Sequence, residues 1–571
     1  MPIKVLDPQL IARIAAGEVV ERPASAVKEL VENALDAGAT QIVVETREGG
    51  TTLIRVTDNG SGIPPSEVEL AFARHATSKI SSFDDLESIS TLGFRGEALA
   101  AIAAVAEVEL ATCTSDAAGS YVRLKNGDII EQTSQGRSQG TTVTVRNLFR
   151  NVPARLKFLK SPNIENGRVA NVVTQYALAF PDVAFTLSME GRTVLRTSGG
   201  GHLIDAIVEA YGADVAKNML EVGGKGEYQG ASEIKVTGMA GTPAVNRTNR
   251  NFLSFFVNHR WVNSKLLSFA VEEAYHGMMM TGKHPIAVLN ISIPAAEIDV
   301  NIHPAKTEIK FHDEHQVFAA VQRAVRQILV APFPSSETRS KIEEPPAAFA
   351  ALPPGTVPLP FVVNHDDKSS IRHTPDSRPV PAFSLPALRL LGQIAATYIV
   401  AEGPDGLYLI DQHAAHERVQ FERVTSQMSV KKVEVQGLLE PVTFEVDPRQ
   451  ESVLRSHLAD LADCGFLLEP FGARTYLVRT IPACLHRKDW TYVLRELTDD
   501  VDTGSKWTEK LAQSIACHSA VRAGQVMTVD EMRELLRQLE KTALPGNCPH
   551  GRPTMIRLTV ADLEREFGRR G

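Results

Sequence analysis

The chain has few cysteines and no long apolar run, and both absences narrow what it can be. Its 571 residues include five cysteines, at positions 113, 464, 484, 517 and 548, without the paired spacing of a disulfide framework. This usage favours a reducing compartment, so we expect a cytoplasmic protein. The N-terminus lacks the apolar core of a signal peptide, and no stretch approaches the length of a membrane span.

Two further absences exclude particular modes of nucleotide and nucleic-acid binding. The chain contains no GxxxxGK[ST] pattern, which excludes a P-loop. Its formal net charge of −8 argues against a uniformly basic surface, although local basic patches can still bind nucleic acid. With 43% hydrophobic and 22% charged residues, the composition is that of an ordinary soluble protein. A chain of this length predicts about two to four domains.

A proline-rich stretch at residues 332–383 divides the chain. Dense proline removes backbone donors and disfavours helix, so we expect an extended, disordered linker rather than a long packed loop, which is rare at this length. A new helix pattern begins after Gly200, within GGHLIDAIVEAYG. We therefore predict domains at 1–200 and 201–331, the linker, and a C-terminal domain at 384–571.

The stretch DQHAAHERVQFE at 411–422 concentrates metal-ligating side chains directly after an apolar run. On a helix beginning near Gln412, His413 and Glu417 share one face, with His416 alongside. Imidazole plus carboxylate suits Zn²⁺ or Mn²⁺ better than Ca²⁺, although solvated helix faces carry the same pairs. Three later residues would complete a mixed metal site if they converge on this helix: Cys517, Cys548 and His550.

A second polar helix face occurs near the N-terminus. Glu29, Asn33 and Asp36 fall at i, i+4 and i+7 within ELVENALDAGA, where the apolar residues supply the opposite packing face. An exposed acidic helix face would have the same spacing. Three glycine-bearing segments follow, DNGSGI at 58–63, GFRGEAL at 93–99 and GTTV at 140–143, and each alone could be a simple turn.

Together with ATSKI at 76–80, these segments closely resemble the ATP-binding motifs shared by gyrase, Hsp90, histidine kinases and the MutL family. LFRNVPARLKFL at 148–159 and VNIHPAKTEIKF at 300–311 resemble the MutL family of mismatch-repair ATPases in particular. The resemblance extends to both ends of the chain. It implies an α/β (α+β) protein: a GHKL-type α/β sandwich ATPase domain, a small α/β transducer domain with a crossover connection, and an α+β C-terminal domain that holds a homodimer together.

The resemblance also implies an ATP site. Glu29 would be the general base for the attacking water, and Asn33 would hold the Mg²⁺ that bridges the phosphates. Asp58 would accept from the adenine amino group, assisted by Thr142. The amides at the start of the GFRGEAL helix can receive phosphate oxygens. The remaining ATP-site residues would be Gly60, Gly62, Thr77, Gly93, Phe94, Arg95, Gly96, Leu99 and, reaching the γ-phosphate from the second domain, Lys306.

By the same resemblance, ATP would order a lid around residues 71–91 and close the two N-terminal domains of a dimer into a clamp on double-stranded DNA. Basic clusters offer candidate DNA contacts at Arg155, Lys157 and Arg260. Phosphate neutralisation requires such residues on one face, and Arg155 and Lys157 could equally form structural ion pairs.

Residues 411–422 resemble the endonuclease motif of MutL proteins that nick DNA themselves. ACHSAVRAG, CPHGRP and a terminal Phe567-Gly-Arg569 resemble its companion motifs, although His518 stands where Lys or Arg is usual. Arg552 would neutralise the scissile phosphate or form a salt bridge. Thiolates favour Zn²⁺ and carboxylates favour Mn²⁺ or Mg²⁺, so a two-metal site is implied. Its ligands would be Asp411, His413, Glu417, Cys517, Cys548 and His550, and its catalytic carboxylates Asp411, Glu417 and Glu422.

The segment QGLLEP at 436–441 resembles the peptide that docks on the replication sliding clamp, with Gln436, Leu439 and Pro441 as its contacts. A plain strand start would look the same. The resemblance further implies the mismatch-recognition protein MutS as a partner, no membrane, and a nucleoid-associated bacterial location. The alternative function is a non-nucleolytic, ATP-gated matchmaker whose C-terminal ion only holds the fold.

Overall fold

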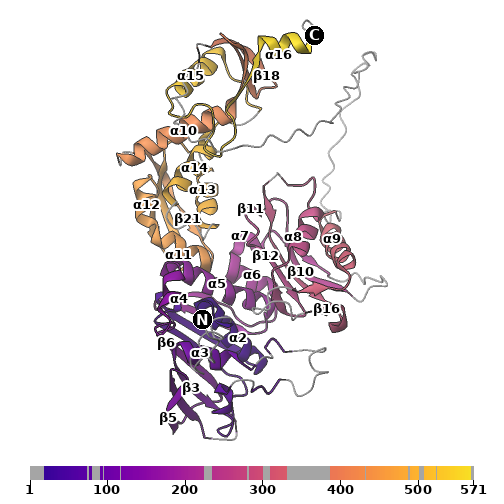
Figure 1. The fold of residues 1–571 in the computed structure, drawn as a ribbon, viewed down its shortest axis with the longest axis vertical. Coiled ribbons are helices and arrows are strands. Elements are labelled where there is room, and N and C mark those ends of the chain that lie inside the picture. The colour runs from indigo at the N-terminus through magenta and orange to yellow at the C-terminus, as the bar shows by residue number, and fades with distance from the viewer. Residues whose placement is uncertain are drawn as a thin grey trace, which may run out of the picture.

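The computed structural model describes most of the chain (Figure 1): residues 19–73, 76–79, 91–93, 96–115, 118–223, 234–279, 282–299, 309–330, 386, 388–430, 433–485, 489–499, 507–521 and 524–567. Several sequence-based predictions fall outside these residues. They concern the linker at 332–383, the centre of the lid, Phe94, Arg95, Lys306 and Arg569. No helix in the described ranges is both long and apolar enough to cross a lipid bilayer.

The N-terminal domain is an eight-stranded sheet covered on one face by helices, as predicted. The strand order is β5-β4-β3-β6-β2-β1-β7-β8, and β1 and β7 form its one parallel pair among the described residues. The strands are β1 (Gln41–Arg47), β2 (Leu53–Asp58), β3 (Glu107–Cys113), β4 (Ser120–Lys125), β5 (Asp128–Ser134), β6 (Gly140–Arg146), β7 (Ala184–Met189) and β8 (Arg192–Arg196). The covering helices are α2 (Pro23–Asp36), α3 (Ala98–Val105) and α5 (Pro162–Ala179). The short α4 (Pro153–Phe158) lies between β6 and α5 in the chain and has no buried residue.

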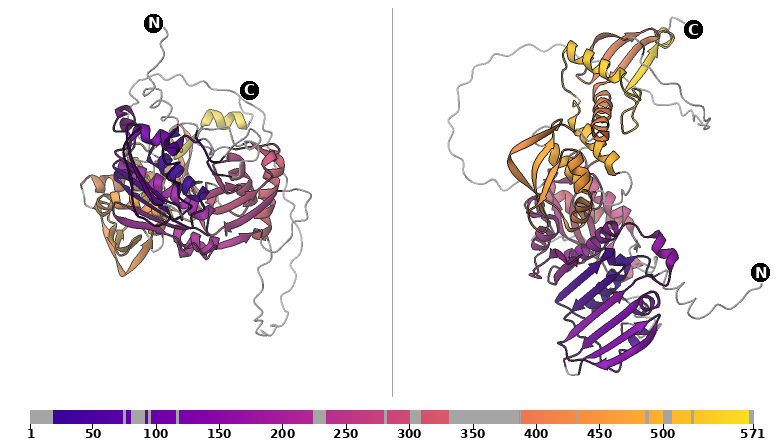
Figure 2. Two further views of the ribbon diagram at one scale, coloured as in Figure 1. Left: turned by 90° about the horizontal axis from the view of Figure 1, so that it is seen from below. Right: turned by 90° about the vertical axis from the view of Figure 1, so that its left-hand side faces the viewer.

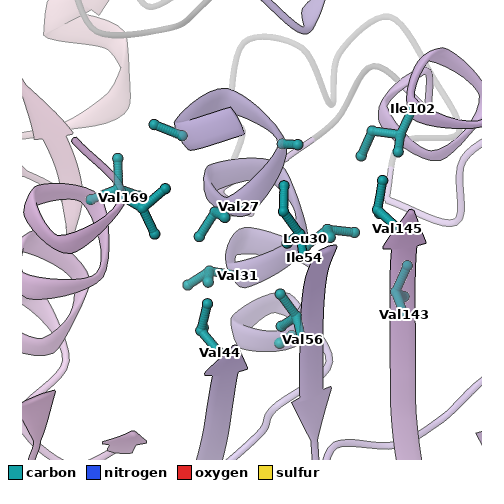
Figure 3. Close-up of a cluster of buried hydrophobic side chains, with 14 of the residues drawn as sticks. Val27, Leu30, Val31, Val44, Ile54, Val56, Ile102, Val143, Val145 and Val169 are labelled. Carbon is teal, nitrogen blue, oxygen red and sulfur yellow. The ribbon is translucent and has the colours of Figure 1, made fainter. Parts of the chain in front are cut away.

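Helix α2 forms because its sequence suits both its start and its buried face. Pro23 stands in the first turn, where its missing N–H costs nothing. Val27, Leu30 and Val31 recur at helical spacing and point at Val44 and Val56 of the sheet (Figure 3). This packing leaves Glu29 and Asn33 at the partly exposed edge of the helix. The hydrophobic core therefore fixes where the predicted catalytic face lies.

The second domain is built on a five-stranded sheet ordered β13-β12-β15-β10-β9. Strands β12 and β15 are parallel neighbours with a helix between them in the chain, which is the predicted crossover. Helices α8 (Lys265–Ala274) and α9 (Glu314–Val330) cover one face, and α6 (Leu203–Tyr211) covers the other, with the short α7 (Ala213–Ala216) after it. The strands are β9 (Met219–Val222), β10 (Lys235–Gly241), β12 (Leu253–Val257), β13 (Arg260–Val262) and β15 (Ala287–Ser292).

The C-terminal region has two hydrophobic cores joined by one long helix, α10 (Gln412–Ser429), which Figures 1 and 2 show running between them. One core lies under the sheet β18-β19-β20-β24, made of β18 (Arg389–Ile394), β19 (Tyr398–Gly403), β20 (Gly406–Asp411) and β24 (Met555–Thr559), with α15 (Val529–Glu540) and α16 (Val560–Glu566) nearby. The other combines the sheet β21-β23-β22 with helices: β21 (Val435–Glu445), β22 (Leu467–Pro470), β23 (Thr475–Pro482), α11 (Pro448–Ser456), α12 (Leu458–Asp463), α13 (Asp489–Asp499) and α14 (Trp507–Ser519).

Helix α11 of the C-terminal region packs against α5 of the N-terminal domain (Figure 1). Arg449 is buried there and donates from Nη1 to Asn171 Oδ1 at 3.2 Å and to the carbonyl of Asn251 at 3.1 Å. Asn249 of the second domain donates to the carbonyl of Asp499 at 3.0 Å. The sequence did not predict this contact, which joins all three domains through polar groups.

Candidate ATP site and candidate metal centre

The polar face of α2 is joined to two of the predicted ATP-binding segments. Lys79, in ATSKI, places Nζ 3.0 Å from Asn33 Oδ1 and 2.6 Å from Asp36 Oδ2. Asp36 also accepts from the backbone amides of Leu92, at 2.9 Å, and Gly93, at 3.0 Å. The structure therefore brings the helix, ATSKI and the start of GFRGEAL together, as the motifs predicted.

Lys79 and the central role of Asp36 were not predicted from the sequence. Lys79 lay inside a recognised motif, but spacing alone could not show that its ammonium points back at Asn33. The ammonium of Lys79 lies against the side-chain oxygens of Asn33 and Asp36, where a metal cation could also bind. Hard oxygen donors of this kind fit Mg²⁺.

Asp58 lies at the end of β2, at the far side of this region. Its Oδ1 accepts from the amide of Gly60 at 2.9 Å and that of Thr141 at 3.2 Å. Burial raises the pKa of this carboxyl, and the two backbone hydrogen bonds oppose that shift. Thr142 lies beside it, where β6 pairs with β2, and its hydroxyl donates to Thr57 at 3.2 Å. The two residues predicted to recognise adenine therefore share one edge of the sheet.

Backbone packing explains the glycines near this edge. A Cβ on Gly62, whose φ is +74°, would lie 2.1 Å from the carbonyl oxygen of Cys113. A Cβ on Gly60 would lie 2.8 Å from the carbonyl oxygen of Ala37, and one on Gly96 only 2.2 Å from that of Ala76. These positions thus require glycine for the fold itself. Of the other predicted residues, Thr77 accepts from the amide of Lys79 at 3.2 Å, and Leu99 packs against the core.

Five predicted ligands converge at the C-terminal end. His413, Glu417 and Cys517 form one group and Glu417, Cys548 and His550 a second, each with one ligand atom per residue and all atoms within 4.8 Å of one another. Glu417, only 5% exposed, belongs to both. Its Oε1 lies 3.3 Å from His413 Nε2, and its Oε2 lies 3.4 Å from His550 Nδ1.

The surrounding contacts orient these ligands. His413 Nδ1 lies 2.8 Å from the carbonyl oxygen of Val521, so Nδ1 carries the proton and Nε2 faces the cluster. His416 is not part of either ligand group, and its Nδ1 instead accepts from the amide of Val521 at 2.8 Å. His518, the departure from the usual motif, places Nε2 3.2 Å from Glu496 Oε2.

Electrostatics within the cluster keep the central carboxylate, Glu417, ionised. Burial raises the pKa of Glu417, but hydrogen bonds from His413 and His550 outweigh this and hold it well below its usual range. Burial and the adjacent Glu417 raise the pKa of the Cys517 thiol to about 12. A thiol of this kind becomes a thiolate when a metal ion replaces its proton. One buried carboxylate, two imidazoles and two sulfurs are a donor set that fits Zn²⁺.

Two predicted carboxylates do not join the cluster. Asp411 caps α10, since its Oδ1 accepts from the amides of His413, at 2.9 Å, and Ala414, at 3.1 Å. Glu422 accepts from the amide of Ala543 at 2.8 Å and lies 3.8 Å from Arg418 Nη1. Both side chains therefore have structural roles here, a helix cap being worth about 1 kcal/mol.

The predicted clamp peptide is exposed. Gln436, Leu439 and Pro441 all lie on the surface of β21, and Leu439 has a relative exposure of 105%. The pairing of β21 with β23 shifts register between Gly437 and Val442, so the segment between them departs from regular strand pairing. The apolar side chain of Leu439 is thus presented to solvent.

The three predicted DNA contacts differ in placement. Lys157 is exposed, and Arg155 is half-buried with Nη1 donating to the carbonyl of Val20 at 2.5 Å. Arg260 is only 7% exposed and donates to the carbonyl of Thr91. The guanidinium of Arg260 therefore does not lie on an accessible surface, which argues against its predicted DNA contact.

The N-terminal fold and its polar helix face define an ATPase domain of the class found in histidine kinases, DNA gyrase B and Hsp90. Residues 21–148 match the family "Histidine kinase-, DNA gyrase B-, and HSP90-like ATPase". Residues 207–330 match "DNA mismatch repair protein, C-terminal domain", and residues 391–527 match "MutL C terminal dimerisation domain".

Whole-chain relatives agree. The chain is 42% identical over 581 residues to the DNA mismatch repair protein MutL of Desulforudis audaxviator, and 40% identical over 592 residues to that of Methanoculleus marisnigri, each alignment covering 99% of both chains. Among solved structures, the ADP complex of the Aquifex aeolicus MutL ATPase domain is 29% identical, covering 48% of this chain and 93% of that one, with a TM-score of 0.37. The assignment rests on the sequence matches: this chain belongs to the MutL family of DNA mismatch repair proteins.

Proposed function

We propose that this chain is an ATP-regulated, metal-dependent nicking endonuclease of mismatch repair. The proposal rests on one observation: four side chains from three separate segments converge on the buried carboxylate of Glu417. They are His413, Cys517, Cys548 and His550.

In the N-terminal half, Glu29 acts as general base, and Asn33 with Asp36 presents oxygen ligands to Mg²⁺. Bound there, the ion would neutralise phosphate charge as the terminal phosphoryl group leaves. Asp58 accepts from the adenine amino group, and Lys79 is released from Asn33 and Asp36 to pair with phosphate oxygens. The proposal for Lys79 follows from its position, because its ammonium occupies the oxygens that a metal ion would need.

In the C-terminal half, Glu417 and the two imidazoles would hold the catalytic ion together with Cys517 and Cys548. Zn²⁺ suits the sulfurs, and Mn²⁺ or Mg²⁺ suits an exchangeable position beside Glu417. A divalent ion at this position would supply Lewis acidity for phosphodiester hydrolysis. Asp411 and Glu422 would have to give up backbone amides before they could act as ligands, so we assign neither to the resting site.

The partners follow from the exposed surfaces and the family. The C-terminal dimerisation domain supports a homodimer. The exposed segment around Leu439 fits the hydrophobic groove of a sliding clamp, and Lys157 with Arg155 fits the phosphates of double-stranded DNA. MutS would deliver the mismatch signal.

A nicking assay on supercoiled plasmid with Mn²⁺ tests the proposal. We expect the purified chain to convert supercoiled plasmid to open circles and a chelator to stop it. The second candidate function is a matchmaker with a structural ion, favoured by the two sulfurs of the cluster and by the burial of Glu417 and Cys548. A chain that binds ATP and dimerises but leaves the plasmid intact would support this second function.

A further inference from the structure

Lys28, directly before the proposed general base, is a buried lysine. It is 8% exposed, and its Nζ lies 2.8 Å from Glu32 Oε1 and 3.7 Å from Glu29 Oε1. Burial alone would lower the pKa of Lys28, but the charges of Glu32 and Glu29 raise it above its ordinary value. The lysine is therefore charged and lies between two carboxylates of one helix.

Glu32 is also held by Tyr176 of α5, at the same carboxylate oxygen that faces Lys28. The phenol donates to Glu32 Oε1 at 2.5 Å, and Tyr176 is only 1% exposed. Burial and the charge of Glu32 raise the pKa of this phenol well above its ordinary value, so it remains a proton donor. Glu32 is thus fixed by a phenol and an ammonium, and the ammonium is in turn fixed relative to Glu29.

Arg260 extends the same group into the second domain. It is buried near Glu32, Asp36 and Tyr176, and the charges of Glu32 and Asp36 oppose the lowering of its pKa by burial. Its other contact is the carbonyl of Thr91, just before Gly93. The cluster of Lys28, Glu32, Tyr176 and Arg260 therefore joins α2 and α5 to the second domain.

A purely structural purpose explains this cluster poorly. Buried ion pairs can often be replaced by apolar residues of similar volume at no loss of stability. Lys28 and Glu32 are both buried, so a pair of apolar residues at these two positions would pack without any charge to desolvate. What an apolar residue could not do is hold the carboxylate of Glu29.

We propose that Lys28 is a positioning residue for ATP hydrolysis: its ammonium, held by Glu32 and Tyr176, keeps the Glu29 carboxylate oriented toward the attacking water. The inference rests on the proposed role of Glu29. As the water oxygen bonds to the γ-phosphorus, Glu29 takes its proton, and the bond to the bridging oxygen breaks with its electron pair leaving on ADP. A carboxylate free to rotate would meet that water less often.

Steady-state ATP turnover and the affinity for a non-hydrolysable ATP analogue test this, using the full chain with Lys28→Met, Lys28→Arg and Glu29→Gln. We expect Lys28→Met to lower kcat about 10- to 100-fold, with analogue affinity changed by less than about threefold. Lys28→Arg restores part of kcat because it restores the charge. Lys125→Met, which removes an exposed lysine of the same domain at the end of β4, leaves turnover unchanged.

The outcomes separate this inference from the proposed function. Normal turnover in Glu29→Gln overturns the role of Glu29 itself. If Glu29→Gln does not hydrolyse ATP and Lys28→Met hydrolyses it at the normal rate, only the role of Lys28 is overturned. Lys28→Met could also lose kcat, analogue affinity and thermal stability together, with no recovery in Lys28→Arg. That result would show that Lys28 has a structural role, and it would overturn the positioning role. Should Lys28→Met not fold, Tyr176→Phe takes its place, since it removes one hydroxyl and should lower kcat without lowering affinity.

Discussion

The carboxylate of Glu417 lies 3.4 Å from Nδ1 of His550, a residue 133 positions later in the chain. The other oxygen of the same carboxylate lies 3.3 Å from His413, one helical turn away. Glu417 is thus the one residue shared by both ligand groups found among the described residues. A substitution at this residue should disrupt both groups together.

We expect Glu417→Gln to lose bound metal. The amide is a weaker ligand and leaves two imidazoles without their anionic partner, so affinity should fall about tenfold or more. Metal content after gel filtration, measured by mass spectrometry, checks this. Glu422→Gln is the matched control from the same helix, because Glu422 is held by backbone amides outside the cluster. Equal metal loss in both variants would contradict the placement of Glu417 at the centre.

Arg260→Met should affect ATP turnover and leave DNA binding nearly unchanged, because Arg260 is buried against α2 and Thr91. The measurement is DNA affinity as a function of salt. Lys157→Ala should lower the slope of log K against log salt by about one, as expected for one lost phosphate contact. A similar loss of slope in Arg260→Met would restore the original prediction that this arginine contacts DNA.

The stability of the folded state should depend on pH through Asp499, which lies at the contact between the C-terminal region and the second domain. Burial raises its pKa to about 6, against the opposing charge of Arg247. Because the folded pKa lies above the unfolded value of about 3.9, the folded state gains stability as pH falls through about 6 and loses it as pH rises. The loss amounts to about 2 to 3 kcal/mol at most.

Asp499→Asn removes this titration and keeps the acceptor that Gln450 uses at 2.6 Å. Thermal unfolding at about pH 5 and about pH 7.5 should show the wild type losing stability relative to the variant as pH rises. A wild type that gained stability relative to Asp499→Asn over this interval would show that the carboxylate is paired more strongly than it is desolvated.

Leu439→Ala should abolish stimulation of nicking by the sliding clamp, because the exposed leucine is the apolar anchor of the predicted peptide. The measurement is the ratio of nicking rates with and without clamp. Val442→Ala, which removes an exposed apolar side chain just past the peptide on the same strand, is the control. Undiminished stimulation in Leu439→Ala would refute the docking site.

The sequence predicted the fold class and five side chains that lie together in the structure, because residue type and motif order identify the groups that must converge. That these five bind a metal ion stays a prediction. The sequence also placed Asp411 and Glu422 in the metal site, whereas both carboxylates accept backbone amides in this structure. Residue type alone does not distinguish a carboxylate that caps a helix from one that binds metal. Arg260 was misread because charged residues are usually exposed, and its burial depends on partners from distant segments. The contact of Arg449 with Asn171 follows no local pattern at all.

The most direct test of the central claim compares nicking by the wild-type chain and by Glu417→Gln, purified identically and supplied with Mn²⁺ and supercoiled plasmid. We predict open circles from the wild type and intact plasmid from the variant, with both proteins dimeric and both hydrolysing ATP. Equal nicking by the two proteins, or intact plasmid with the wild type, would contradict the assignment of the C-terminal cluster as a nuclease centre.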